Sequence, residues 1–257
     1  MVVYAGQGDA RRTMALLWGT EERRAARPGP KPGLSVEAIV AAGIEVADAE
    51  GMAALSMRAV GERLGRTAMA LYTYVPSKTE LIDLMYDRVL GELPATYPVE
   101  RGWRDAAVAW AHDLREFYIR HPWVLQVSQA RPVLGPNEFT MIDTVTGILR
   151  GTGLPPERLR GVVAALVDVV RGAARTVAET RQAPAATGVS DEEWWRARSA
   201  LLLEVAPDFA GRFPSVSWLE RGDAVPVAEG EVPYLEQVAR RTFAGSLDTL
   251  LDGVTGR

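Results

Sequence analysis

The chain has 257 residues, with 29 lysine and arginine residues against 33 aspartate and glutamate residues, so its formal net charge is -4. It contains no cysteine, which excludes disulfides, thiolate zinc sites and thiol nucleophiles. It also lacks an apolar run of the roughly 18 residues that a bilayer requires and a basic start followed by a long apolar stretch. We therefore expect a cytoplasmic protein of two domains that does not associate with a membrane.

The first 34 residues mix glycine, arginine and proline without periodicity, and we expect a flexible arm with Met14 as an alternative start. Within the arm, four cations follow one another without an acid between them, and prolines keep the string extended. Such an arm fits the minor groove of DNA, although a solubilising tail has the same composition and Glu21 and Glu22 lie just upstream. The four cations are Arg23, Arg24, Arg27 and Lys31.

The stretch from 35 to 90 predicts four short helices. Ser35, Ser56 and Ser77 are suited to N-caps, and Gly51 and Gly65 to helix stops. The second and third helices, joined at Gly65, give a helix-turn-helix pattern, whose second helix can lie in the major groove of DNA. Two short helices joined at a glycine also occur in helical cores that bind no DNA. The predicted ranges are 35–51, 56–64, 67–74 and 78–91.

The remaining chain also shows helical periods and no sustained alternation of apolar and polar residues. We predict helices at 103–121, 122–130, 136–152, 155–182, 190–205 and 232–252, with an irregular segment at 206–230. The expected fold class is all-α. A three-helix helix-turn-helix domain at 35–82 is followed by a linking helix and a larger helical domain at 83–257.

The segment "LYTYVPSKTELIDLM" at 71–85 resembles the TetR/AcrR family of transcriptional regulators, and the spacing back to Ser56 matches that family without a gap. The resemblance is specific over about residues 35–90 and only architectural beyond. It implies a homodimeric, ligand-responsive regulator, a repressor that leaves a pseudo-palindromic operator when a small-molecule effector binds. Dimerisation would use the helices at 157–181 and 232–252. No cofactor is expected.

Tyrosine hydroxyls and a lysine at a helix start are suited to phosphate oxygens of the duplex. The resemblance places Arg58 at a base edge, where arginine pairs bidentately with guanine, and Met69 among small or apolar residues suited to thymine methyl groups. The tyrosines could instead pack on the next helix, and Arg66 could simply be solvated. The expected base contacts are Arg58, Thr67, Ala68, Met69 and Tyr72; the expected phosphate contacts are Ser56, Arg66, Tyr74 and Lys78, and Tyr72 also suits a phosphate.

Aromatic residues at 103, 110 and 117 are seven apart and share one face of a helix, which suits either a pocket wall or a plain core. By resemblance we expect a pocket for a large, flat, mostly apolar aromatic molecule. Trp110 and Ser128 stand where the tetracycline-binding branch has metal-site or polar ligands, so no metal is expected. The predicted pocket residues are Trp110, Leu114, Phe117, Trp123, Ser128, Asp168 and Arg171, with Trp103 and Arg175 as weaker candidates.

An all-α enzyme is one alternative, but the catalytic inventory is thin. His112 and His121 do not form a zinc-binding pair on one helix, and neither a glycine-rich phosphate loop nor a nucleophile-elbow motif occurs. The other alternative is a helical ligand-binding or scaffold protein without DNA binding. A gel-shift experiment, in which the purified protein retards the DNA immediately upstream of its own gene, would distinguish a regulator from both alternatives.

Overall fold

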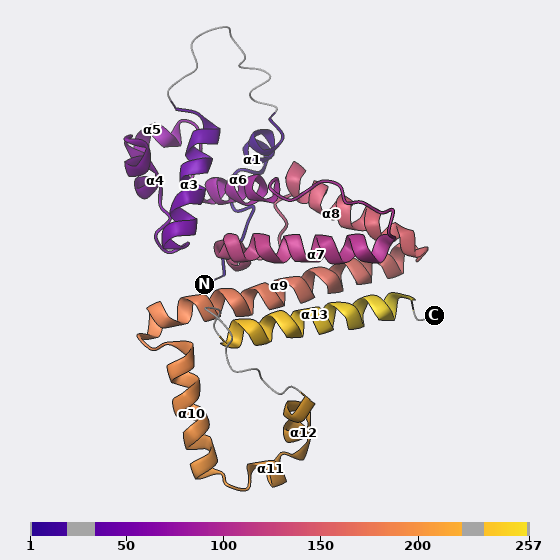
Figure 1. Cartoon of the computed structure of the whole chain (residues 1–257). Helices are drawn as coiled ribbons and strands as arrows, with labels where there is room; N and C mark the ends of the chain where they lie inside the picture. Colours follow the sequence, from indigo (N-terminus) through magenta and orange to yellow (C-terminus); the bar gives the residue numbers. More distant parts are fainter. Residues whose placement is uncertain (1, 20–33, 223–233, 256–257) are drawn as a thin grey trace.

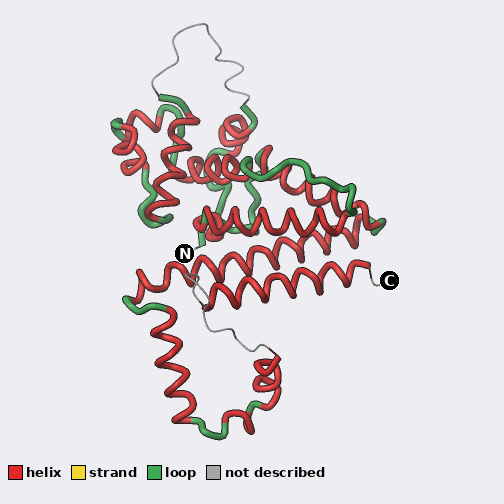
Figure 2. Tube along the Cα trace, viewed as in Figure 1, coloured by secondary structure: helices red, strands yellow, loops and turns green. Residues whose placement is uncertain are grey.

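The computed structural model describes residues 2–19, 34–222 and 234–255, and Figure 2 shows that these ranges consist of helices joined by loops. The only β-type pairing within these described ranges is an isolated bridge between Val3 and Val127. None of the described helices is long and apolar enough to cross a bilayer. The predicted all-α fold class is confirmed.

Three helices form the N-terminal unit: α3 (Val36–Glu50), α4 (Met57–Leu64) and α5 (Ala68–Tyr72). The hydroxyl of Ser35 accepts a hydrogen bond from the N–H of Ala38, and that of Ser56 accepts one from Ala59. These N-caps satisfy N–H groups that have no partner inside the helix. Helix α3 packs on α4 and contributes the fully buried Ile39 to the core.

The linking helix α6 (Lys78–Leu90) runs between this unit and the larger body, and it packs against α3 on one side and α8 on the other (Figure 1). In the body, α7 (Trp103–Arg120) lies between α8 (Pro136–Leu149) and α9 (Pro156–Thr187). Helix α13 (Tyr234–Thr255) lies alongside α9 and runs in the opposite direction (Figure 1). A single core therefore extends from the three-helix unit through α6 to α9.

The N-terminal segment differs from the predicted flexible arm over residues 2–19. Helix α1 (Ala10–Leu17) packs on α6, with Leu17 at its buried end, and Ala5 is 1% exposed. The Val3 N–H donates to the carbonyl of Gln126 (2.9 Å). Sequence periodicity could not reveal this segment, because its anchors are mostly backbone groups. The predicted minor-groove cations, Arg23, Arg24, Arg27 and Lys31, lie outside the described residues.

Three further predictions of helix bounds were wrong. The segment 122–130 forms only a 3-10 turn, η1 (Pro122–Gln126), because the chain then extends to pair with the N-terminal segment. Helix α9 continues through Pro184 to its end before Gly188, whose φ of 73° stops it; a proline in the last turn removes only one hydrogen bond. The segment predicted as irregular contains α11 (Phe209–Arg212) and α12 (Pro214–Gly222). A short 3-10 turn, η2 (Arg150–Thr152), follows α8.

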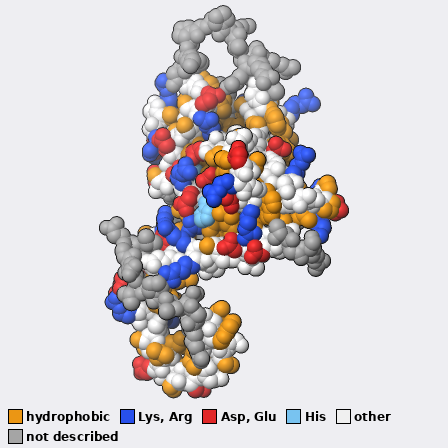
Figure 3. Space-filling view, turned by 45° about the vertical axis from the view of Figure 1, so that its right-hand side comes forward, with side chains coloured by type: hydrophobic (Ala, Val, Ile, Leu, Met, Phe, Trp, Pro, Cys, Tyr) orange, Lys and Arg blue, Asp and Glu red, His pale blue; other side chains and the backbone are white. Residues whose placement is uncertain are grey.

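Helices α10 (Asp191–Val205), α11 and α12 form a lobe that projects from the body opposite the three-helix unit (Figure 1). No residue of α10 is buried. Figure 3 shows hydrophobic side chains on the surface of this lobe. Trp218 is 72% exposed and Leu203 is 70% exposed. A helix that buries nothing gains no packing energy in this arrangement.

A cluster of hydrogen-bonded side chains around the buried His121 joins the three-helix unit to the body. The Nδ1 of His121 lies 2.8 Å from Asp48 Oδ1, and its Nε2 lies 3.1 Å from Glu92 Oε2. The indole N–H of Trp123 also donates to Asp48 (2.8 Å). Burial lowers the pKa of His121, but the hydrogen bonds and charges of the two carboxylates outweigh burial and raise it above its ordinary value.

The raised pKa of His121 predicts a pH-dependent contribution to stability. A folded-state pKa above the unfolded one stabilises the fold fully below the unfolded value, and this contribution is lost as pH rises through the folded value. We expect His121→Gln to lower the free energy of unfolding by about 1–3 kcal/mol near pH 5.5, with the difference shrinking toward about pH 9. Urea unfolding across this range measures it. The exposed His112→Gln is the control; a loss of stability for His121→Gln that does not change with pH would contradict the interpretation.

Candidate functional site

The turn between α4 and α5 is tight enough to require glycine at two positions. Gly65 has a φ of 64°, in the left-handed region that glycine adopts without strain. The Arg66 N–H donates to the carbonyl of Gly61 (2.8 Å), and a Cβ on Gly61 would lie 2.7 Å from the Arg66 carbonyl oxygen. Helices α4 and α5 therefore pack at close range in a helix-turn-helix, and the fully buried Leu71 anchors α5 to the core.

The residues predicted to contact bases lie on α4 and at α5. Arg58 is in the first turn of α4, with an 85% exposed side chain and an ion pair to Glu62 (2.8 Å). Thr67 precedes α5 and is exposed, and its side chain makes no capping hydrogen bond. Met69 is 75% exposed and Tyr72 40% exposed. Ala68 is half-buried at the start of the helix. The exposed side chains of this set are accessible to a binding partner.

The predicted phosphate contacts lie around the same unit. Ser56 uses its hydroxyl oxygen as the N-cap of α4, which leaves its O–H free to donate. Lys78 is the first residue of α6 and is half-buried, and Arg66 is exposed. Tyr74 is half-buried and packs against the core, which is the alternative role that the sequence allowed for the tyrosines. Whether its hydroxyl also reaches a phosphate stays a prediction.

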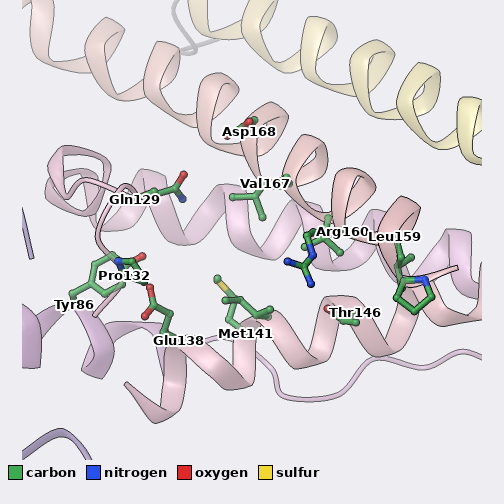
Figure 4. A pocket seen from close by; sticks show the side chains of 14 residues that line it. Tyr86, Gln129, Pro132, Glu138, Met141, Thr146, Leu159, Arg160, Val167 and Asp168 are labelled. Carbon is green, nitrogen blue, oxygen red and sulfur yellow. The ribbon is translucent and has the colours of Figure 1, made fainter. Parts of the chain in front are cut away.

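A cavity of about 640 Å³ lies in the body, between α6, the segment after η1, α8 and α9 (Figure 4). Its walls are mainly apolar, with charged or amide groups at a few points. The lining residues are Tyr86, Gln129, Pro132, Glu138, Met141, Ile142, Thr146, Pro156, Leu159, Arg160, Val163, Ala164, Val167 and Asp168. A volume of this size accommodates a drug-sized molecule.

Most of the predicted pocket residues do not line this cavity. Trp110, Leu114, Phe117 and Trp123 are each at most 1% exposed and belong to the core. Helix α7 has neighbours on several sides, and its aromatic stripe fills the space between them. The weaker candidate Trp103 packs against the linker after α8, where Gly151 approaches its Cβ.

The polar members of the predicted pocket divide between two roles. Asp168 on α9 lines the cavity. Arg171 instead donates to the carbonyls of Leu125 (2.7 Å) and Val127 (2.8 Å), which fixes the end of η1 on α9. Arg175 donates to the carbonyl of Leu125 as well. Ser128 lies in the segment paired with the N-terminus, where its N–H donates to the carbonyl of Val3.

Buried carboxylates on α6 lie near Glu138, which lines the cavity. The N–H of Gly6 donates to both oxygens of Asp83 (3.1 Å each), and the N–H groups of Asn137 and Glu138 donate to Asp87 (3.0 Å each). Burial, together with the charges of Glu80 and Glu138, raises the pKa of Asp83 to about 6. Burial also raises the pKa of Asp87.

Two further carboxylates complete this group. Burial raises the pKa of Glu80, but hydrogen bonds from Ser77, from the N–H of Asp9 and from its own backbone N–H outweigh burial and leave it below the ordinary value. The pKa of Glu138 is raised by burial and by the charge of Asp87. We call Glu80, Asp83, Asp87 and Glu138 the carboxylate group. Sequence reasoning missed it, although acids at 80, 83 and 87 on an otherwise apolar helix face were a visible signal.

Comparison with known proteins adds the deciding observation. The model of the bacterial regulatory proteins of the tetR family matches residues 39–85, and the model of the tetracyclin repressor-like C-terminal domain matches residues 94–257. The chain belongs to the TetR family. As a TetR-family chain it is a DNA-binding transcriptional regulator rather than an enzyme, and the predicted family is confirmed.

Individual relatives agree with this assignment. The HTH-type transcriptional repressor DrrR1 of Streptomyces coeruleorubidus is 42% identical over 218 residues, which cover 84% of this TetR-family chain and 78% of DrrR1. An HTH-type transcriptional regulator of Saccharopolyspora erythraea is 35% identical over 72% of this chain and 77% of its own. The structure of Streptomyces coelicolor ActR in complex with actinorhodin superposes with a TM-score of 0.65, over 87% of this chain and 99% of that chain, at 24% identity.

Proposed function

We propose that this protein is a homodimeric repressor that leaves a pseudo-palindromic operator when a small, largely apolar aromatic effector enters the cavity. The observation that carries the proposal is the position of α6. This helix begins at Lys78, directly after the helix-turn-helix, and Tyr86 on the same helix lines the cavity. A molecule in the cavity therefore touches the element on which the DNA-binding unit rests.

The relatives support this assignment. DrrR1 is named a repressor, and ActR is described in complex with actinorhodin and, in another structure, with (S)-DNPA. The cavity of the present chain is bounded by residues such as Met141, Leu159 and Val167. Apolar walls of this kind favour a flat apolar ligand through the hydrophobic effect.

On the DNA, the exposed residues of α4 and α5 would read bases while residues around them hold phosphates. Arg58 would exchange its solvent-exposed pair with Glu62 for a guanine edge, at small cost because water screens an ion pair that is this exposed. Lys78 would contact a phosphate. The minor-groove role of the cations between 23 and 31 stays a prediction, since these residues lie outside the described ranges.

The dimer would form through α9 and α13. A groove of about 400 Å³ runs between these helices, lined by residues that include Ala173 and Gly172 on α9 and Leu235, Val238 and Phe243 on α13. Small residues on α9 allow a partner helix to approach closely, and the partner's α9 and α13 would complete a four-helix bundle. Two-fold symmetry of the dimer then requires an operator of matching symmetry. The exposed apolar lobe, which joins α9 to α13, supports burial of this side against the partner.

The base-reading role of Arg58 predicts a sequence-dependent loss of binding. Arg58→Ala should weaken operator binding by about 1–3 kcal/mol and relax the preference at one base pair of each half-site. Lys78→Ala should weaken operator and random DNA alike and reduce the dependence of affinity on salt. Fluorescence anisotropy with both DNAs at several salt concentrations measures this. Equal losses on both DNAs for Arg58→Ala would remove Arg58 from the base-reading role, and wild type without operator preference would overturn the proposed function.

The proposed dimer face predicts that Val238→Arg yields a monomer. Near the start of α13, a guanidinium at the proposed face loses hydration when the partner's helices pack against it, so association should become unfavourable. Light scattering coupled to size exclusion measures the mass, and the operator affinity should fall with it because one half-site is lost. The matched control is Val99→Arg, at a 55% exposed valine in the loop before α7. A dimeric Val238→Arg protein with normal operator binding would place the interface elsewhere.

A further inference from the structure

One end of the cavity contains a carboxylate that is buried and held in place. Glu138 is 7% exposed, and its Oε2 accepts a hydrogen bond from the N–H of Leu134 (2.7 Å). Figure 4 shows its side chain extending from the start of α8 toward Pro132, at the end of the cavity where Tyr86 and Gln129 also lie. Its orientation is therefore set before any ligand arrives.

Negative charge accumulates behind Glu138. Asp87 and Asp83 lie close enough for their charges to act on it and to be acted on by it. Among the described residues, no lysine, arginine or histidine forms an ion pair with any member of the carboxylate group. The N-terminus of α8 offsets only about half a unit charge. One buried cation lies in the neighbourhood: the charge of Arg171 acts on Tyr86, while its guanidinium donates to the carbonyls of Leu125 and Val127. A second cation at this end would meet the combined negative potential of several carboxylates in surroundings of low polarity, where charges interact strongly.

The other charged groups of the cavity are less constrained. Asp168 and Arg160 both lie on α9 and are exposed, and their separation by eight residues corresponds to about 12 Å along the helix. Neither has a hydrogen bond or ion pair within the described ranges. Tyr86, in contrast, is 5% exposed and presents an aromatic ring beside Glu138, a surface that attracts cations.

We propose that the effector carries a positively charged amine beside its flat apolar portion, and that Glu138 is the residue that binds this amine. The apolar portion lies between α8 and α9, against Met141 and Leu159, and the amine lies at the end formed by Glu138 and Tyr86. This inference rests on the proposed function, because it takes the cavity as the effector site. It adds the charge class of the effector and the residue that selects it.

Three fluorescent probes of one shape and different charge test the proposal on the full-length protein. They are 9-(methylaminomethyl)anthracene, which is cationic at pH 7, neutral 9-anthracenemethanol and anionic 9-anthracenecarboxylate. Probe anisotropy gives each dissociation constant. For wild type we expect the cation to bind at least about tenfold more tightly than the alcohol, and the anion to bind most weakly. Equal binding of cation and alcohol, tighter binding of the anion, or no binding of the cation would overturn the proposal.

Variants then locate the selective residue. Glu138→Gln keeps an oxygen that can accept the Leu134 N–H, and we expect it to bind cation and alcohol within about twofold of each other. Asp168→Asn, at an exposed carboxylate of the same cavity, should keep the preference of wild type. A preference that persists in Glu138→Gln and disappears in Asp168→Asn would assign the amine to Asp168 and overturn the role of Glu138. The wild-type probe series decides the charge class even if one variant folds poorly.

Operator binding without any probe separates this proposal from the proposed function. A protein that retards its operator but shows no preference for the cationic probe is a repressor whose effector is not an amine. A protein that prefers the cation but binds no operator keeps the amine site and loses the proposed function.

Discussion

Helix α6 carries three buried carboxylates whose hydrogen bonds come from segments far away in the sequence. Glu80 accepts from the N–H of Asp9, Asp83 from that of Gly6, and Asp87 from the start of α8. A buried carboxylate that loses its donors retains its desolvation cost, which amounts to several kcal/mol. The helix therefore cannot shift along or around its axis without replacing these bonds. Since α3 packs on the same helix, the position of the DNA-binding unit follows from them.

This constraint gives the cavity a physical route to the operator. Tyr86 lies next to Asp87 on α6. Glu138 belongs to the first turn of α8, and the N–H groups of this turn donate hydrogen bonds to Asp87. A ligand at this end contacts both partners of that attachment. For such a ligand to regulate, it must bind one arrangement of α6 and α8 more tightly than the other. A bound cation supplies this difference if it neutralises Glu138 in one arrangement only, because the repulsion between Glu138 and Asp87 then decreases.

The sequence was sufficient for the helix-turn-helix and insufficient for the cavity, for a physical reason. Serine N-caps and the glycine turn at 65 are local features, and the short helices formed where these features predicted them. The cavity depends on where α8 and α9 fail to fill the space between them. Leu159, Val163 and Val167 on α9 have the same four-residue spacing that a packed core has, and the aromatic stripe of α7 has a more conspicuous spacing yet is core. Burial periodicity cannot distinguish a filled face from a face that lines a cavity.

The N-terminal segment was missed for a related reason: the groups that hold it are backbone N–H groups of residues such as Gly6 and Asp9, which leave no side-chain pattern. The carboxylates that accept from them were visible, but acids in a helix are more often solvated. A buried acid becomes predictable only when its neighbours in space are known. Both failures concern the same region, where α6 meets the rest of the chain.

The distance between the two DNA-binding units of the proposed dimer tests the central claim most directly. The chain has no cysteine, so Ala53→Cys places one spin label on each exposed loop between α3 and α4. Double electron–electron resonance then compares the parent with Asp87→Ala, and with Asp143→Ala on an exposed part of α8 as the control. The account predicts that Asp87→Ala shifts or broadens the distance distribution by several ångströms, and that Asp143→Ala leaves it unchanged. A distribution in Asp87→Ala that superimposes on the parent would show that the carboxylates of α6 do not set the position of the DNA-binding unit.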